Sequence, residues 1–261
     1  MSASSVSGPY AAFFDLDGTL AVGNGPPSAA DRDAIRAFRL QGNYAFLCTG
    51  RSPAFLYPAV LDIGFDGVVS GAGAHITLGN TILHRRMLSR ETIKSVIDYS
   101  VRSGDVCVLE GETSMFQVAA RGKTRFSWTK TGGGDDFLTR YPDEVITKLT
   151  YFCPFNDELQ ALLSELHVIQ HPDYFEAVPG GCSKSDGLRR VLEALDLPRE
   201  NSLAFGDSMN DLDMLTYAGV GIAMGNAVDP IKAAADRVTL PLSENGVAAA
   251  LALWTEQTFK N

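Results

Sequence analysis

The stretch AAFFDLDGTL, residues 11–20, decides which fold the sequence predicts. Its apolar residues lead directly into two aspartates, Asp15 and Asp17, and a glycine and a threonine follow. This order is typical of a buried strand that ends in a loop. Because side chains two residues apart on a strand point to the same side, we expect both carboxylates to project together from the strand's end. Two anions held so close favour either a cation between them or one protonated member.

The composition is that of an ordinary globular protein. The chain has 261 residues, of which 45% are hydrophobic, enough for a substantial core. Its formal net charge of −9 argues against a nucleic-acid backbone or an anionic membrane as partner. The four cysteines are scattered and form no Cys-x-x-Cys pair, which favours core thiols over a zinc site or a disulfide framework. With no signal-like start and no apolar run of membrane-spanning length, we expect a soluble cytoplasmic protein.

Strand and helix patterns alternate on both sides of the central part of the chain. The first strand is followed by a helical pattern over residues 28–42 and by a second buried strand within 43–50. A third short strand, DGVVSG, covers residues 66–71. The alternation returns late in the chain, where strands are expected over 202–207 and 220–225. It predicts an α/β fold whose parallel sheet is covered by helices on both faces.

The central part of the chain has a different pattern of expected strands and helices. Between residues 84 and 181, short strand patterns lie close together and helical patterns are few. Clustered strands with few helices predict an α+β unit inserted into the α/β domain. We therefore expect one domain over residues 1–83 and 182–261 and an inserted domain over 84–181. Within the insertion, the glycine-rich KTGGGDD, residues 130–136, is expected to form a loop.

Further carboxylates follow an apolar strand late in the chain. In AFGDSMNDLDML, residues 204–215, Asp207 stands where a strand ends and Asp211 lies in the turn or first helical turn beyond it. Ligands of open α/β sheets gather at the carboxyl ends of the strands, which would bring these residues towards Asp15 and Asp17. Capping of helices is the alternative role for such aspartates. Four converging carboxylates favour a hard divalent cation with oxygen ligands, and Mg²⁺ is the natural choice.

Four motifs follow one another in a recognisable order. D-x-D-G-T-L is followed by the strand-terminal threonine of CTGR, by a lysine, and by G-D-S-x-N-D-x-x-M-L. This set resembles the four motifs of the haloacid dehalogenase (HAD) superfamily. GVGIAMGNAVDPIKAAADRVT and ENGVAAAL are similar to the Cof-type phosphatases, subfamily IIB, of that superfamily. The likeness covers roughly residues 10–85 and 180–255 and implies a Rossmann-like parallel-sheet core with an inserted α+β cap domain.

The resemblance also implies an activity and a cofactor. It implies a phosphomonoester hydrolase that needs Mg²⁺ and acts on small phosphorylated metabolites, sugar phosphates above all. Asp15 would attack phosphorus and form an aspartyl-phosphate, while Asp17 would protonate the leaving oxygen and later deprotonate water. Asp15, the backbone carbonyl of Asp17 and Asp207 would hold Mg²⁺. Asp211 would be a further ligand, or it would contact the ligands without binding the metal itself.

Two further motifs would complete the phosphate site. Thr49 offers a hydroxyl and Gly50 a backbone N–H group to the phosphate. Lys184 stands where a helix is expected to begin, a place at which the helix dipole disfavours a cation, so an anion should lie beside it. The resemblance makes that anion the phosphate and the nucleophile. Asn210 would orient Lys184 or touch the phosphate, and Arg51 would reach the substrate or remain solvated.

Other residues depart from the pattern or leave their role open. The subgroup commonly shows Asn-Gly-Ala after the third strand, whereas this chain has SGAGAHI, with Ala72 at the place of the asparagine. This departure calls into question a substrate contact that the asparagine would make in the subgroup. In the inserted domain, Glu110, Arg121 and Trp128 either face the active site or serve the packing and surface of the domain, the commoner role.

Two other functions stay open beside the hydrolase. One is a phosphotransferase or phosphomutase on the same scaffold, in which the aspartyl-phosphate passes to a sugar hydroxyl instead of water. The other is a non-catalytic, metabolite-binding regulatory protein that retains the fold. Phosphate release with no acceptor present favours the hydrolase over the transferase, and turnover of any phosphate ester excludes the regulatory protein.

Overall fold

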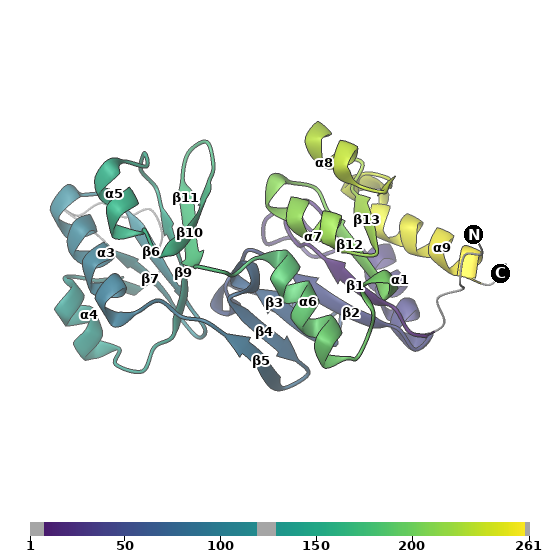
Figure 1. The fold of residues 1–261 in the computed structure, drawn as a ribbon, viewed down its shortest axis with the longest axis horizontal. Coiled ribbons are helices and arrows are strands. Elements are labelled where there is room, and N and C mark those ends of the chain that lie inside the picture. Colours follow the sequence, from purple (N-terminus) through teal and green to yellow (C-terminus); the bar gives the residue numbers. More distant parts are fainter. Residues whose placement is uncertain (1–7, 119–128, 259–261) are drawn as a thin grey trace. The chain divides into compact units, whose positions relative to one another are not determined.

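The computed structural model describes residues 8–118 and 129–258 of the chain. Contacts divide these residues into two compact units, whose elements are labelled in Figure 1. The first unit holds residues 8–50, 56–83 and 183–258, and the second holds residues 51–55, 84–118 and 129–182. The chain therefore leaves the first unit twice, once for five residues and once for the long insertion.

The first unit is built on an eight-stranded sheet with the strand order β14-β13-β12-β1-β2-β3-β4-β5. The strands from β14 through β3 run parallel, whereas β4 pairs with β3 in the antiparallel direction. The strand bounds are β1 Ala11–Phe14, β2 Tyr44–Cys48, β3 Gly67–Ser70, β4 His75–Leu78, β5 Thr81–Arg85, β12 Ser202–Gly206, β13 Val220–Ala223 and β14 Arg237–Val238. The opening stretch thus supplies a central strand, with β12 on one side and β2 on the other.

Helices bury both faces of this sheet. Every residue of β1 is buried, and its side chains alternate between two hydrophobic clusters. Phe14 packs in a cluster with residues of α1, α2 and α9, and Phe13 packs in a cluster with residues of α6, α7 and α8. The helix bounds are α1 Ala29–Leu40, α2 Pro58–Leu61, α6 Lys184–Ala194, α7 Leu212–Tyr217, α8 Asp229–Ala234 and α9 Gly246–Thr258. The predicted α/β class, with a doubly covered parallel sheet, is confirmed.

Short 3₁₀ helices shape several of the connections. They are η1 Pro53–Phe55, η2 Gly71–Gly73, η3 Arg199–Asn201, η4 Met209–Asp211 and η5 Leu242–Glu244. Two of them follow the carboxyl end of a parallel strand closely, η2 after β3 and η4 after β12. Loops at that edge of an open α/β sheet are where ligands bind, so these turns shape the expected site.

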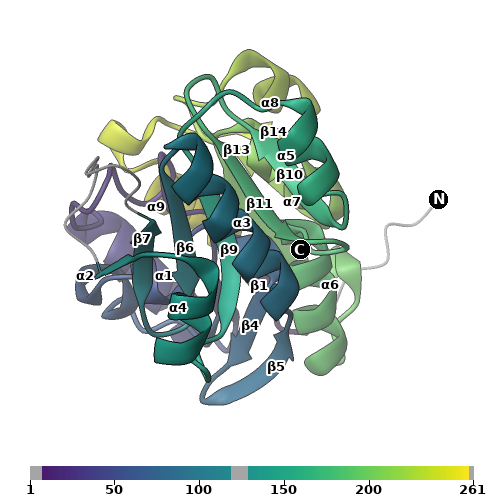
Figure 2. The same ribbon diagram turned by 90° about the vertical axis from the view of Figure 1, so that its left-hand side faces the viewer.

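The second unit is an α+β sheet layer with helices on one face. Its six strands lie in the order β10-β11-β9-β6-β7-β8, and α3, α4 and α5 lie on the viewer's side of them in Figure 2. All the pairings are antiparallel except that of β7 with β8. The bounds are β6 Cys107–Gly111, β7 Met115–Val118, β8 Thr129–Thr131, β9 Ile146–Tyr151, β10 Leu166–Gln170, β11 Phe175–Pro179, α3 Arg90–Ser103, α4 Gly134–Arg140 and α5 Asp157–Leu162. The insertion of an α+β unit is confirmed.

The glycine-rich stretch differs from its expectation. Instead of a loop throughout, it contains the end of β8, and Gly134 begins α4. A Cβ atom on Gly134 would lie 2.8 Å from the Cα atom of Lys94, and the Gly134 N–H donates to Asp98 Oδ1 at 2.9 Å. The glycine therefore serves the close approach of α4 to α3 rather than backbone freedom. Arg121 and Trp128 lie outside the described residues.

Two further features concern the helices and the cysteines. No helix within residues 8–118 and 129–258 is long and apolar enough to cross a membrane. All four cysteines are thiols, and Cys48, Cys107 and Cys182 are buried. Burial raises the pKa of the half-buried Cys153 to about 12, so this thiol also stays protonated near neutral pH.

Candidate active site

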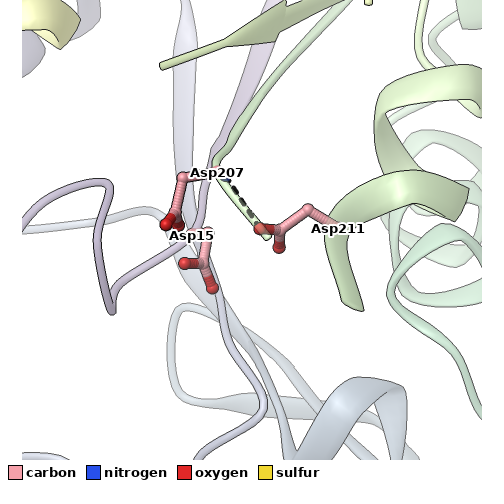
Figure 3. A group of neighbouring side chains, drawn as sticks. All are labelled: Asp15, Asp207 and Asp211. Atoms are coloured by element: carbon pink, nitrogen blue, oxygen red, sulfur yellow. Dashed lines mark hydrogen bonds between the residues drawn. The ribbon is translucent and has the colours of Figure 1, made fainter. Parts of the chain in front are cut away.

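The first and last motifs meet because their strands are neighbours. Asp15 follows β1 directly, and Asp207 follows β12 directly. The two strands pair in parallel with Phe14 opposite Phe205, and the Asp15 N–H donates to the Phe205 carbonyl at 3.0 Å. Both aspartates therefore leave the same edge of the sheet. Figure 3 shows them beside each other, with Asp211 reaching in from the turn beyond β12.

Three carboxylates converge at this edge. Carboxylate oxygens of Asp15, Asp207 and Asp211 all lie within 4.8 Å of one another. Asp15 and Asp211 are buried, with 3% and 0% of their surface exposed, and Asp207 is half-buried. Asp211 also holds the turn itself, because its Oδ2 accepts from the N–H groups of Asp207 and Ser208 at 3.0 Å each. Asp211 therefore caps this turn, the alternative role that the sequence suggested, and it is also a member of the carboxylate cluster.

Lys184 brings a buried positive charge to the carboxylates. It is the first residue of α6, 2% exposed, and Ser183 caps the helix by accepting from the Asp186 N–H at 3.1 Å. The ammonium donates to Asp15 Oδ1 at 2.6 Å and to Asp211 Oδ1 at 2.5 Å. These two anions offset the unfavourable position of a cation at a helix N-terminus. The anion expected beside Lys184 is thus at least the Asp15 carboxylate.

The negative charge of the three carboxylates exceeds the positive charge of Lys184. Burial raises the pKa of Asp15 to about 8, helped by the charge of Asp211 and opposed by Lys184. Burial and the charge of Asp211 likewise raise the pKa of Asp207 to about 6. Burial disfavours a charged Lys184, but the two carboxylates outweigh it and hold the Lys184 pKa well above its usual value. One ammonium is thus too little positive charge to keep three neighbouring carboxylates ionised.

The donor set fits a magnesium ion. Mg²⁺ prefers hard oxygen ligands and is usually held by only one or two carboxylates, with its other positions left to water or substrate oxygens. The cluster offers carboxylate oxygens alone, from three residues at one edge of the sheet. A divalent cation there would supply the positive charge that the described groups lack.

Asp17 and the glycine that follows it lie in a tight loop. The Asp17 side chain is exposed and is not part of the group of three carboxylates. Gly18 has a φ of +90°, and its N–H donates to the Ala21 carbonyl at 2.9 Å. A Cβ atom on Gly18 would lie 2.3 Å from Asp207 Oδ2. Only glycine fits this position, because the loop is folded directly against the Asp207 carboxylate.

Asn226 is a residue that the sequence argument missed. Its Nδ2 donates to the Gly18 carbonyl at 2.8 Å, and its Oδ1 accepts from the Leu242 N–H at 2.7 Å. Asn226 therefore links the loop after β1 to the first residue of η5. The only sequence signal was its place in the phrase AMGNA, which carried the resemblance but suggested no contact.

The second motif ends the strand next to β1. Thr49 follows β2 and is buried; its N–H donates to the Val69 carbonyl at 2.8 Å, and its carbonyl accepts from the Ala72 N–H at 3.1 Å. Ala72 makes that contact with a φ of 51°, a left-handed conformation that asparagine and glycine adopt more easily than alanine. Alanine in place of the subgroup's asparagine therefore introduces backbone strain and also removes the amide side chain.

Asn210 and Arg51, two residues expected near the phosphate or the substrate, belong to different units. A Cβ atom on Gly50 would lie 3.8 Å from Asn210 Nδ2, and Asn210 Oδ1 accepts from the Ser208 hydroxyl at 2.6 Å. Asn210 thus lies beside Gly50. Arg51 belongs to the second unit, where its guanidinium lies 4.7 Å from the ring centroid of Phe55. Asn210 therefore lies with the first unit's motifs, and Arg51 is grouped with the second unit.

Comparison with known proteins identifies the family. The model of the haloacid dehalogenase-like hydrolases matches residues 12–251. The chain belongs to this family. The family expected from the four motifs is thereby confirmed, and so is the expectation of an enzyme.

Relatives and solved structures agree with this membership. The chain is 30% identical to the 5-amino-6-(5-phospho-D-ribitylamino)uracil phosphatase YcsE of Bacillus subtilis strain 168 over 249 residues, which cover 92% of this chain and 93% of YcsE. The phosphatase YitU of the same strain, named for the same substrate, is 28% identical over 92% of this chain and 95% of its own. A structure of a protein from Geobacillus kaustophilus HTA426 shares 27% identity with a TM-score of 0.83, covering 95% of this chain and 99% of that one. The HAD subclass IIB sugar phosphatase BT4131 shares the fold, with a TM-score of 0.80, 22% identity and coverage of 94% and 99%.

Proposed function

We propose that this HAD-like hydrolase is a Mg²⁺-dependent phosphatase that hydrolyses monoesters of small phosphorylated metabolites, sugar phosphates above all, through an aspartyl-phosphate. The observation that carries the proposal is the buried Asp15 carboxylate. It is held by the Lys184 ammonium at the carboxyl edge of the sheet, beside Asp207 and Asp211. A nucleophile needs such fixed orientation, and a phosphate dianion needs such positive charge.

The reaction follows from the roles that these residues can take. An Asp15 carboxylate oxygen attacks phosphorus in line, and the bond to the ester oxygen breaks. Asp17, exposed and two residues further along, gives its proton to the leaving oxygen. The resulting Asp17 carboxylate then takes a proton from water, whose oxygen attacks the phosphorus of the aspartyl-phosphate. Inorganic phosphate leaves, Asp15 is restored, and Asp17 is protonated again.

The remaining residues of the motifs bind and orient. Lys184 balances charge on Asp15 and on the transferring phosphoryl group. Thr49 and Gly50 bind phosphate oxygens, and Asn210 supports them from beside Gly50. Arg51, the next residue along the chain, remains a proposed contact to the substrate.

The magnesium ion would be held by Asp15, Asp207 and the backbone carbonyl of Asp17. When bound, it offsets the repulsion between the anionic nucleophile and the phosphate. Both Asp211 oxygens already accept hydrogen bonds, Oδ2 from two backbone N–H groups and Oδ1 from Lys184. These bonds favour a role for Asp211 in positioning Lys184 and the Asp207 turn over direct metal binding.

The domain roles complete the proposal. We assign residues 1–83 and 182–261 to the catalytic core, because all the residues with proposed roles except Arg51 belong to the first unit. Residues 84–181 form the cap domain, which selects the substrate. The thiol state of the four cysteines supports a location in the cytoplasm.

Phosphate release tests the function directly. The full chain is assayed with p-nitrophenyl phosphate and a panel of sugar phosphates, without any acceptor, in Mg²⁺ or in excess chelator. We expect release in Mg²⁺, none in chelator, and a loss of at least about 1,000-fold in kcat for Asp15→Asn, which keeps the shape but removes the nucleophile. Asp33→Asn, which changes a largely exposed carboxylate on α1, is the matched control and keeps full activity. Release that needs neither Asp15 nor Mg²⁺ would overturn the proposal.

A further inference from the structure

The first turn of α6 is bound by a carboxylate from a neighbouring helix. Asp213 lies in the first turn of α7, and its Oδ2 accepts from the Ser185 N–H at 2.9 Å. The amide groups that begin a helix have no acceptor within it, so Asp213 supplies one from another element. In the motif G-D-S-x-N-D-x-x-M-L, Asp213 occupies the second of two adjacent open positions. The family resemblance therefore gives it no role.

The bonded amide belongs to the peptide unit that Lys184 begins. A peptide unit is planar, so the Lys184 Cα atom lies in the same rigid group as the Ser185 N–H. A lysine side chain has a flexible four-carbon stem, and its ammonium is placed accurately only when its Cα atom is fixed. The bond to Asp213 therefore fixes the point from which the Lys184 side chain starts.

One short segment thus holds both ends of Lys184. Asp211 Oδ1 accepts from the ammonium at 2.5 Å, and Asp213, two positions later, accepts from the backbone directly after Lys184. Asp211 ends η4, and Asp213 is the second residue of α7. A shift of α6 relative to this segment would change the distance from the ammonium to Asp15 as well as to Asp211.

Packing also brings the start of α6 close to its neighbours. A Cβ atom on Gly73 of η2 would lie 2.2 Å from the Ser183 carbonyl oxygen. A Cβ atom on Gly187 of α6 would lie 2.4 Å from Val69 Cγ1 on β3. Packing of this kind is far less directional than a hydrogen bond. The bond to Asp213 therefore adds what packing lacks, a fixed orientation of the first turn.

We propose that Asp213 is a positioning residue for the phosphatase reaction and acts through Lys184. This inference rests on the proposed function and extends it to a residue outside the catalytic set. The Asp213 carboxylate orients the first turn of α6, and the Lys184 ammonium thereby reaches Asp15 at 2.6 Å. Because that ammonium stabilises charge on the transferring phosphoryl group, a small displacement of it lowers kcat.

A double-mutant cycle tests whether Asp213 acts through Lys184. The full chain, Asp213→Ala, Lys184→Ala and the double variant are assayed in Mg²⁺ with p-nitrophenyl phosphate, below the melting temperature of each. We expect kcat to fall at least about tenfold in Asp213→Ala. In the Lys184→Ala background the same change should alter kcat by less than about twofold, because the group that Asp213 positions is already gone. A merely structural role would lower kcat by the same factor in both backgrounds.

Three single variants sharpen the test. Asp213→Asn keeps an oxygen that accepts from the Ser185 N–H, so it should recover most of the kcat lost in Asp213→Ala. Asp213→Ser has its oxygen one bond closer to the backbone and should not recover it; this variant replaces Asp213→Ala in the cycle if Asp213→Ala does not fold. Glu193→Ala is the matched control, because it removes an exposed carboxylate near the end of α6 that pairs with Arg189, and its kcat should be unchanged.

The inference and the function fail in different ways. An unchanged kcat in Asp213→Ala, equal losses in both backgrounds, or no recovery in Asp213→Asn would overturn the inference. Phosphate release by the unsubstituted chain would still uphold the phosphatase in each of these cases. If the unsubstituted chain released no phosphate, both the function and the inference built on it would be wrong.

Discussion

The three carboxylates at the sheet edge should make the metal-free protein less stable as pH rises. Burial and neighbouring charge raise the pKa of Asp15 to about 8, whereas its ordinary value is 3.8. Between these pH values the folded protein keeps a proton on Asp15 that the unfolded chain has already lost. Stability therefore falls with rising pH across this window, because the folded state binds more protons than the unfolded state. The raised pKa of Asp207, about 6, acts in the same direction over a narrower window.

The size of the effect follows from the shift. A pKa difference of roughly four units corresponds to a free energy of unfolding that is up to about 5 kcal/mol lower at about pH 8 than at about pH 4. For a chain of this length, that change lowers the melting temperature by about 10 °C. Saturating Mg²⁺ binds only the folded state with its carboxylates ionised, so its stabilising effect should grow with pH.

Thermal melts of the full chain measure this dependence. The chain and Asp15→Asn are melted in excess chelator at several values between about pH 5 and about pH 8, and again in Mg²⁺. Asp15→Asn removes the buried titrating group, so it should flatten the pH dependence and melt higher than the unsubstituted chain at the alkaline end. A chelated protein that is equally stable across this range would refute the electrostatic account of the cluster, and so would an Asp15→Asn variant with an unchanged slope.

Three further predictions concern the loops around the site. Gly18→Ala places a Cβ atom 2.3 Å from Asp207 Oδ2 and gives alanine a left-handed φ, so kcat should fall by about 100-fold. Full activity in this variant would show that the loop can move to accommodate the extra atom. Asn226→Ala frees the Gly18 carbonyl, and kcat/KM should fall by about tenfold, the equivalent of one hydrogen bond; unchanged kinetics would remove Asn226 from the support of the site. Ala72→Gly relieves a left-handed alanine and should raise the free energy of unfolding by about 1 kcal/mol in urea titrations, and a lower value would contradict the strain argument.

The meeting of the first and last motifs could be expected from the sequence because it depends on topology alone. Asp15 and Asp207 each follow a buried apolar run, and the carboxyl ends of parallel strands share one edge of a sheet. That β12 lies directly beside β1 could not be read from the strand patterns. The direct bond from Lys184 to Asp211 was not foreseen either, because it depends on how α6 and η4 pack.

Contacts across long stretches of chain were beyond the reach of local patterns. The bond from Asn226 to Gly18 joins residues 208 positions apart, and no spacing rule points to it. Gly134 was read as part of a loop because glycine clusters favour turns, whereas the structure uses it for helix packing against Lys94. The face shared by Glu110 and Lys148 depends on the register of β6 against β9, and a shift by one residue would move either side chain to the other face.

The most direct test of the account is to trap the phosphoryl group on Asp15. The Asp17→Asn variant should form the aspartyl-phosphate from an activated ester and then hydrolyse it slowly, because it lacks the base that activates water. Acid quenching followed by borohydride reduction converts an acyl phosphate into an alcohol, which peptide mass spectrometry locates as homoserine. The account predicts homoserine at position 15 alone, in amounts that rise with substrate and vanish when Asp15→Asn is combined with the variant. Phosphate release in Mg²⁺ without any acyl phosphate at position 15, or with one at another carboxylate, would contradict it.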